Sequence, residues 1–243
     1  MDKTVFITGA SSGIGHATTQ LLAEKGYRIV ACGRREERLA ALREQWGETL
    51  HTLCFDVRDR EAVFRAVESL PPEFREVEIL INNAGNAHGL EPVEKASLDD
   101  WDAMIDINVK GLLYVTKALL PSLLKDGRGH IINIGSTAGK EVYPRGNVYC
   151  ASKHAVEGLT GSLARELPRP LAAVAVSPGV VDTDMLRQCW AESAGDWAIA
   201  LPVRNGTATT RPASTRIGCG ANPPERLRRR IPHLLETGPS HLA

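Results

Sequence analysis

A tyrosine and a lysine four positions apart are the residues of this sequence best suited to chemistry. Tyr149 and Lys153 lie in a stretch of helical periodicity, so their side chains share one face of a helix. A free phenol titrates at about 10, but a neighbouring ammonium favours the phenolate and lowers the phenol pKa. The pair could therefore move a proton to and from a small molecule at neutral pH. The same spacing also occurs in ordinary amphipathic helices, so other signals must support this interpretation.

A glycine-rich turn near the amino terminus supplies the second signal. The apolar run Thr4–Thr8 leads into Gly9-Ala10-Ser11-Ser12-Gly13-Ile14-Gly15 and then into a helical pattern. Glycines here let the backbone approach a pyrophosphate, which the N–H groups and positive end of the following helix stabilise. A mere tight turn explains one or two glycines but not three in this place. We expect a dinucleotide to contact Gly9, Ser11, Ser12, Gly13, Ile14 and Gly15.

The end of the second predicted strand indicates which dinucleotide binds. Domains that bind NAD place an acidic residue there, and that carboxylate would repel the 2′-phosphate of NADP. Here Cys32 and Gly33 are followed by Arg34 and Arg35, whose planar guanidinium groups suit a phosphate. The sequence therefore predicts NADP(H), held by these two arginines. The alternative is that they only open a solvated helix and pair with nearby glutamates.

Strands and helices alternate in the pattern that would bring these residues together. Short β-branched runs separated by longer helical stretches predict βαβ units and a parallel sheet covered on both faces, which is a doubly wound α/β fold. The predicted strands are Thr4–Thr8, Arg28–Cys32, Thr49–Phe55, Ile79–Asn82, His130–Ile134 and Ala172–Ser177. The predicted helices cover about residues 14–26, 35–46, 59–70, 99–124 and 150–166.

The glycine spacing T-G-x-x-x-G-I-G resembles that of the short-chain dehydrogenase/reductase family. Other marks of the family follow in order between about residues 3 and 185: Asp56-Val57, Asn82-Asn83-Ala84-Gly85, Asn108, Ser136, Tyr149-x-x-x-Lys153, and Ser177-Pro178-Gly179 leading to Thr183. The resemblance implies a Rossmann-like fold and an enzyme that interconverts an alcohol and a carbonyl by hydride transfer to or from the cofactor.

The resemblance also implies roles for individual residues. Tyr149 would be the general acid and base, Ser136 would bind the substrate oxygen, and Asn108 would support a water that carries protons away from Lys153. Tyr149 and Lys153 would also contact the cofactor, Lys153 at the nicotinamide ribose. The remaining expected cofactor contacts are Asp56 and Val57 at the adenine, Asn83, Ala84 and Gly85 at the middle, and Pro178, Gly179, Val181 and Thr183 at the nicotinamide.

Several longer stretches narrow the resemblance to bacterial NADP-dependent 3-hydroxy-acid dehydrogenases, which act on serine and allo-threonine. They include Cys32–Leu39, Leu90–Ser97, Gly129–Gly139 and Gly146–Tyr149. One alternative is a 3-ketoacyl-carrier-protein reductase or broad carbonyl reductase, for which Arg165 and Arg169 could form a docking patch. Another is a redox sensor that binds NADP(H) without turnover.

Composition limits the other possibilities. Lys+Arg and Asp+Glu are 29 each, so the zero net charge gives no electrostatic argument for a nucleic-acid or membrane partner. No signal peptide or run of about 18 apolar residues is evident, and we expect a cytoplasmic protein with a small-molecule substrate. The five cysteines and seven histidines lack metal-ligand spacing, so no metal is expected, and Cys32 and Cys54 are expected to be buried.

The carboxyl-terminal part breaks the alternation of strands and helices. We expect one domain over residues 1–201 and an atypical tail of the same domain over 202–243, rich in Arg and Pro, with one short helix candidate near Glu225–Leu235. The last strand that the family usually has is not evident there. A homodimer through the helices near 99–124 and 150–166 is expected, and a homotetramer depends on that missing strand.

Overall fold

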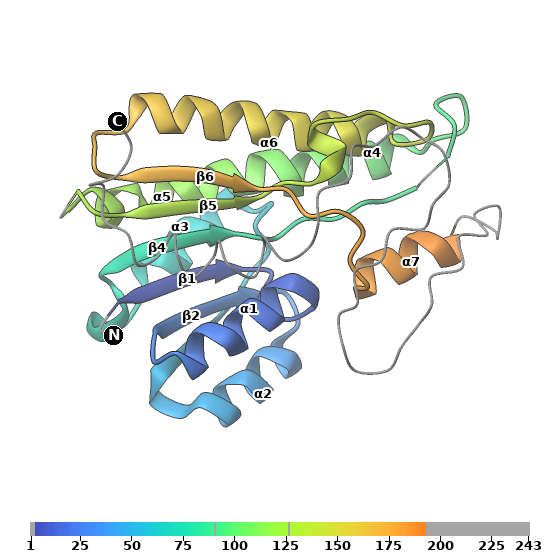
Figure 1. Ribbon diagram of the computed structural model, residues 1–243. Coiled ribbons are helices and arrows are strands. Elements are labelled where there is room, and N and C mark those ends of the chain that lie inside the picture. Colours follow the sequence, from blue (N-terminus) through green and yellow to red (C-terminus); the bar gives the residue numbers. More distant parts are fainter. Residues whose placement is uncertain (1–2, 90, 126, 193–243) are drawn as a thin grey trace. The chain divides into compact units, whose positions relative to one another are not determined.

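The computed structural model describes residues 3–89, 91–125 and 127–192. Its sheet has six parallel strands in the order β3-β2-β1-β4-β5-β6 (Figure 1). The strands are β1 Thr4–Thr8, β2 Arg28–Gly33, β3 Leu50–Cys54, β4 Val77–Asn82, β5 His130–Ile134 and β6 Ala172–Val176. The predicted doubly wound α/β fold is confirmed.

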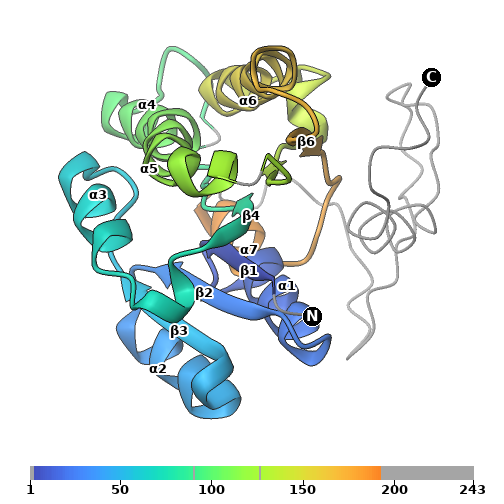
Figure 2. The same cartoon turned by 90° about the vertical axis from the view of Figure 1, so that its left-hand side faces the viewer.

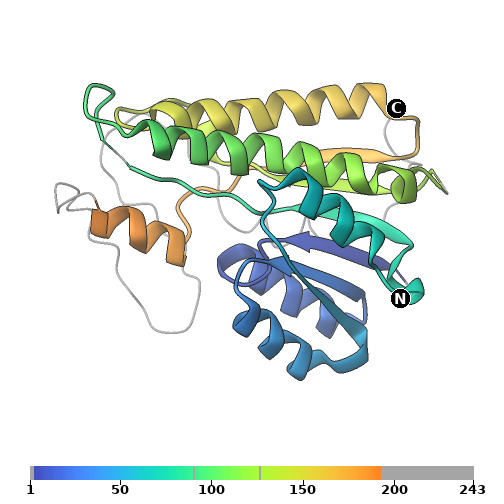
Figure 3. The same cartoon turned by 180° about the vertical axis from the view of Figure 1, so that it is seen from behind.

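Helices cover both faces of this sheet. The helices α1 Gly13–Glu24 and α2 Glu36–Trp46 lie on one face, and α3 Arg60–Glu68, α5 Leu112–Lys125 and α6 Asn147–Glu166 lie on the other (Figure 2). Figure 3 views the second face, where α5 and α6 run side by side. Right-handed crossovers produce this division, because the chain winds outward from β1 to β3 and then in the opposite direction from β4 to β6. Since both faces are covered, β1 is buried along its whole length.

Several predicted boundaries are wrong by a few residues. The strand β3 begins at Leu50 because Thr49 lies in a 3-10 turn, η1 Gly47–Thr49, where its hydroxyl donates to the carbonyl of Trp46. The helix α6 begins at Asn147, whose side chain accepts from the N–H of Val148 and so stabilises the first turn. Cys54 is exposed, contrary to the prediction, because it ends β3, which is an edge strand of the described sheet.

The predicted helix over 99–124 is interrupted. It consists of α4 Leu98–Ile105, a π-helical turn η3 Asp106–Gly111, and α5. Such turns often occur at functional sites. A further helix, α7 Asp184–Glu192, was not predicted at all. It lies at the end of the sheet toward which the strands point (Figure 1).

The strand order reverses between β1 and β4, which are neighbours in the sheet. In open α/β sheets, ligands bind outside the carboxyl ends of the strands at such a point. The predicted phosphate loop follows β1 here, and Asn83 follows β4. The tail over 202–243, its helix candidate and the missing last strand lie outside the described residues. Within the described residues, no helix is both long and apolar enough to cross a membrane.

Candidate active site

The predicted phosphate loop, Gly9–Gly15, leads into the amino terminus of α1, and its three glycines leave the backbone accessible there. Gly9 and Gly13 have φ angles of +67° and +53°, a left-handed conformation that favours glycine. A Cβ atom at Gly15 would lie 2.3 Å from the carbonyl oxygen of Gly9, so no larger residue fits there. The first turn of α1, which includes Ile14, has N–H groups without intrahelical partners, as at any helix start. The loop can therefore receive an anionic group closely against backbone N–H groups.

A buried threonine joins this loop to the neighbouring strand end. The Thr8 hydroxyl accepts hydrogen bonds from the N–H groups of Asn83 and Ala84, each at 3.0 Å. In return, the Asn83 amide donates to the carbonyl of Thr8 at 2.9 Å and to that of Gly9 at 3.3 Å. Asn83 thus fixes the loop conformation in this structure. Thr8 was not predicted as a site residue, although a hydroxyl at the end of a buried strand could have indicated its role.

The two predicted arginines diverge. Arg35 donates to the hydroxyls of Ser12 and, at 3.4 Å, of Ser11. Arg34 instead lies 3.5 Å from the carboxylate of Asp56, which Arg58 also contacts at 2.7 Å. Partial burial alone would raise the pKa of Asp56, but the hydrogen bonds and charge of Arg58, with the charge of Arg34, lower it. The structure therefore brings Arg35 to the phosphate loop and Arg34 to the expected adenine end.

Val57, the neighbour of Asp56, packs on the helix interruption. A Cβ atom at Gly111 would lie 2.7 Å from a methyl group of Val57, so glycine at the end of η3 allows this contact. Val57 is buried in the core. The loop that follows β3 is therefore fixed against the start of α5.

The start of α7 packs on the phosphate loop. A Cβ atom at Gly13 would lie 3.1 Å from the Thr183 methyl group. Next to Thr183, the Asp184 carboxylate is 2.8 Å from the Arg38 guanidinium and 3.7 Å from that of Arg35. Arg38 and Asp184 were not predicted as site residues. Arg38 could have been found, since residues three apart on a helix share a face and Arg35 precedes α2 directly.

Lys153 lies deep in the site. Its side chain is buried, its ammonium donates to the carbonyl of Ile134 at 2.9 Å, and it lies 6.0 Å from the centre of the Tyr149 ring. Desolvation by burial lowers the Lys153 pKa to about 8. The lysine therefore still carries its charge predominantly at neutral pH and loses it just above that range. This arrangement places a tunable cation beside the phenol.

Asn108, in the π-helical turn, fixes the loop after β4. Its carbonyl oxygen accepts from the N–H of Asn86 at 2.8 Å, and its amide donates to the carbonyl of Asn86 and to the Ser152 hydroxyl, each at 2.9 Å. A Cβ atom at Gly85 would lie 3.1 Å from the Asn108 oxygen and 3.4 Å from the Lys153 nitrogen. Glycine at 85 thus allows both Asn108 and Lys153 to lie close to the backbone of this loop. The sequence did not indicate Asn86, whose side-chain nitrogen and oxygen are buried without a partner among the described atoms.

Ser136 begins a short 3-10 turn, η4 Thr137–Gly139, and its hydroxyl accepts from the N–H of Ala138 at 3.1 Å. The hydroxyl hydrogen remains available to an incoming oxygen atom. The next residue, Thr137, donates to the carbonyl of Pro178 at 3.0 Å, which joins the loops after β5 and β6. Beyond Pro178, Gly179 and Val181 are exposed. The loop that carries Ser136 is therefore tied to the segment expected at the nicotinamide.

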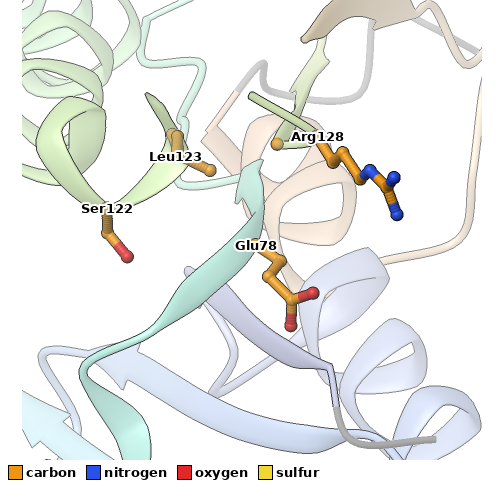
Figure 4. A pocket seen from close by; sticks show the side chains of 5 residues that line it. Glu78, Ser122, Leu123 and Arg128 are labelled. Carbon is orange, nitrogen blue, oxygen red and sulfur yellow. The ribbon is translucent and has the colours of Figure 1, made fainter. Parts of the chain in front are cut away.

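Other features lie away from this edge. A hollow of about 410 Å³ at the amino ends of β4 and β5 is lined by Glu78, Ser122, Leu123, Arg128 and Gly129 (Figure 4). Its hydroxyl and carboxylate already accept from the N–H groups of Val77 and Thr4. Among the described residues, no three His, Cys, Asp or Glu side chains are grouped to hold a metal.

The candidate docking patch for a carrier protein, Arg165 and Arg169, also lies far from Tyr149. At a rise of about 1.5 Å per residue, Arg165 lies about 24 Å along α6 from Tyr149. Arg169 lies in the turn that leads into β6, near the amino ends of the strands. A carrier-protein substrate would need a basic patch beside the site, but α6 carries these two arginines to the opposite edge of the sheet.

Comparison with known proteins gives consistent results. The family model of short chain dehydrogenases matches residues 3–194. The NADP-dependent 3-hydroxy acid dehydrogenase YdfG of Salmonella typhi is 46% identical over 178 residues, which cover 73% of this chain and 72% of that protein. Sulfoacetaldehyde reductase 2 of Chromohalobacter salexigens is 43% identical over 188 residues, 76% of this chain and 75% of the relative. The closed form of a serine dehydrogenase complexed with NADP+ superimposes with a TM-score of 0.76 at 41% identity, covering 79% of this chain and 78% of that one.

Proposed function

The chain belongs to the short-chain dehydrogenase family, and on that premise we propose that it is an NADP-dependent oxidoreductase that interconverts a 3-hydroxy acid and its carbonyl compound. The observation that carries the proposal is the buried Lys153 ammonium 6.0 Å from the Tyr149 ring, at the carboxyl edge of the sheet. A buried lysine with a lowered pKa is typical of a functional site. Here its positive charge would favour the phenolate form of Tyr149.

The residues at the edge fit NADP(H). The bare glycine loop suits a pyrophosphate, and the Ser11 and Ser12 hydroxyls with Arg35 suit the 2′-phosphate. Asp56 and Val57 would border the adenine, and the segment from Pro178 through Gly179 and Val181 to Thr183 would border the nicotinamide. The cofactor would supply or accept the hydride.

The protein would supply proton transfer and position. In the oxidative direction, Tyr149 takes the proton of the substrate hydroxyl, and in the reductive direction it returns that proton. Ser136 donates its hydroxyl hydrogen to the substrate oxygen and holds it beside the phenol. Asn108 fixes the loop of Gly85 and Asn86 against Lys153, which keeps the cation in place. These roles are supported by the contacts of the described residues and by the family to which the chain belongs.

Similarity to a 3-hydroxy acid dehydrogenase and a serine dehydrogenase supports 3-hydroxy acids such as serine as the substrate class. A carrier-protein substrate has less support, because Arg165 and Arg169 lie at the other edge of the sheet. A sensor without turnover has less support too, because Tyr149 and Lys153 are both present.

The assembly and the compartment belong to the same proposal. Leu98, Leu113 and Leu124 are exposed on α4 and α5, which supports a homodimer through these helices. Cys32, Cys54 and Cys150 are free, which supports a reducing compartment such as the cytoplasm.

The proposal is tested by initial rates at the nicotinamide absorbance band. NADP and NAD are compared in parallel with serine, allo-threonine, 3-hydroxybutyrate, simple alcohols and ketones, and a 3-ketoacyl thioester. We expect turnover with NADP to exceed that with NAD and 3-hydroxy acids to lead. Preference for the thioester would instead favour a 3-ketoacyl reductase over a 3-hydroxy-acid dehydrogenase. NADPH binding without turnover on any compound would favour the sensor instead.

A further inference from the structure

An acidic residue of α7 occupies the arginines next to the phosphate loop. One oxygen of Asp184 lies 2.8 Å from the guanidinium of Arg38 and 3.7 Å from that of Arg35. The same guanidinium of Arg38 is 3.4 Å from the carbonyl oxygen of Ser11. A carboxylate from a distant part of the chain thus sits against the group of cations and hydroxyls that suits a phosphate.

The arginines hold more positive charge than this one carboxylate neutralises. The pKa of Arg35 is lowered, first by its partial burial and then by the charges of Arg38 and Arg34, although Asp184 acts in the opposite direction. A phosphate monoester carries close to two negative charges and three acceptor oxygens, so it can engage both guanidinium groups and a serine hydroxyl together. A 2′-phosphate would therefore bind these arginines more strongly than Asp184 does.

The contact is also open to exchange. The side chains of Arg35, Arg38 and Asp184 are 44%, 49% and 54% exposed, and ion pairs in such surroundings are weak. Asp184 is stabilised elsewhere, because it lies in the first turn of α7, where the helix dipole favours a negative charge. It can lose its arginine partners without being left as an unpaired buried charge.

We propose that Asp184 is an internal anion that competes with the 2′-phosphate of NADP(H) for Arg35 and Arg38, and that Arg38 is a second arginine of the phosphate site beside Arg35. This inference rests on the proposed function, since it assumes that NADP(H) binds at the loop. Bound NADP(H) displaces Asp184, whereas NAD(H), which has no 2′-phosphate, leaves the contact intact. Only NADP(H) then releases the start of α7 from α2.

Equilibrium binding tests this without turnover. NADPH and NADH are titrated by nicotinamide fluorescence, and adenosine 2′,5′-bisphosphate is titrated by calorimetry, with wild type, Asp184→Asn and Arg38→Gln. We expect Asp184→Asn to tighten NADPH and the bisphosphate about two- to fivefold, in line with the strength of an exposed ion pair. NADH affinity should stay unchanged. Arg38→Gln should weaken NADPH about tenfold and leave NADH unchanged.

A matched control and a double variant complete the test. Asp182→Asn removes a carboxylate from the same segment that pairs with Arg187, 2.8 Å away, and it should not change NADPH affinity. In the double variant with Arg38→Gln, the gain from Asp184→Asn should shrink, because the two residues act through one contact.

Two results would overturn the inference. Equal NADPH affinity in wild type and Asp184→Asn would mean that no competition occurs. Weaker binding of both NADPH and NADH by Asp184→Asn would mean that the carboxylate instead helps to close α7 over either cofactor. Tight NADPH binding that responds to Asp184→Asn, without turnover of any substrate, would contradict the proposed activity alone.

Discussion

The surroundings of Lys153 and those of Arg35 lie at the same edge of the sheet, but they admit water very differently. Lys153 is 6% exposed and donates to a main-chain carbonyl, whereas the side chain of Arg35 is 44% exposed and lies near other exposed charged groups. Around Lys153, burial lowers the pKa of the lysine to about 8. Around Arg35, solvent and salt screen each charge.

The difference indicates how the two regions should respond to change. A buried, hydrogen-bonded cation acts strongly on one neighbour, and its loss cannot be replaced by solvent. Several exposed arginines can contact one phosphate, so each contributes only a moderate part of the cofactor affinity, and substitution of one leaves the others in place. Substitutions should therefore have large effects on turnover around Lys153 and smaller effects on cofactor choice around Arg35.

Removal of the Tyr149 hydroxyl should have the largest effect. We expect Tyr149→Phe to lower kcat about 10³- to 10⁴-fold, because no other group would transfer the substrate proton. The NADPH dissociation constant should change less than about twofold, since the arginines and loop remain. Steady-state rates and fluorescence titration measure both quantities. Tyr114→Phe on α5, outside the site, is the control, and substantial activity in Tyr149→Phe would remove this residue from its proposed role.

Lys153→Met should lower kcat about 10²-fold and remove the change in kcat that accompanies deprotonation of the lysine. In the wild type, the assistance of the ammonium to Tyr149 should fade as the pH rises through about 8, where the lysine loses its proton. The variant should lack that change. Lys117→Met, at an exposed position of α5, is the control for loss of a lysine.

The same lysine predicts a direction for stability. Its pKa is about 8 in the folded chain and 10.5 in its ordinary state, so between these values the unfolded chain binds the extra proton. The contribution of Lys153 to the free energy of unfolding should then rise from about pH 8 to 10.5. Chemical denaturation of wild type and Lys153→Met across this range would measure the difference, and a fall in this contribution would contradict the burial of a charged lysine.

Substitution in the arginine cluster should have a smaller effect. Arg35→Gln should weaken NADPH about tenfold, because one charge-assisted contact is lost, and should leave NADH affinity and kcat at saturation nearly unchanged. Arg43→Gln, in the last turn of the same helix α2, is the matched control. An equal loss for NADH would mean that Arg35 only stabilises the loop through Ser11 and Ser12.

Salt should have the smallest effect. Raising ionic strength from about 0.05 M to about 0.5 M should weaken NADPH about three- to fivefold, because the arginines are exposed to screening. The kcat at saturating NADPH should change little, since Lys153 is shielded from ions. A salt-dependent kcat with constant NADPH affinity would reverse the comparison between the two regions.

The features predicted from sequence are those written in short local patterns. The strands are apolar runs, and the loop from Gly9 to Gly15 needs glycine for backbone reasons, so composition indicates both. Because the carboxyl ends of parallel strands meet at one edge, the fold then brings residues such as Asn83, Ser136 and Lys153 to the same side. Their catalytic roles remain predictions, but their location follows from the topology.

The features that were missed depend on contacts between distant residues. The π-helical turn coincides with the bonds of Asn108 to Asn86, and no helical period in the sequence indicates them. The pairing of Asp184 with Arg38 joins α7 to α2, which no local pattern connects. The exposure of Cys54 follows from the position of β3 in the sheet, while its apolar neighbours suggested the opposite.

The hydrogen bond between Thr8 and Asn83 has a consequence for the order in which the molecule assembles. It joins residues 75 positions apart in the chain. The glycine loop therefore acquires its shape only after β4 has docked beside β1, and closing so long a loop is entropically slow compared with forming a local helix. A growing chain that carries only the first three strands would have the glycines without the cradle. We therefore expect competence to bind a dinucleotide to appear late in folding, once the centre of the sheet is complete.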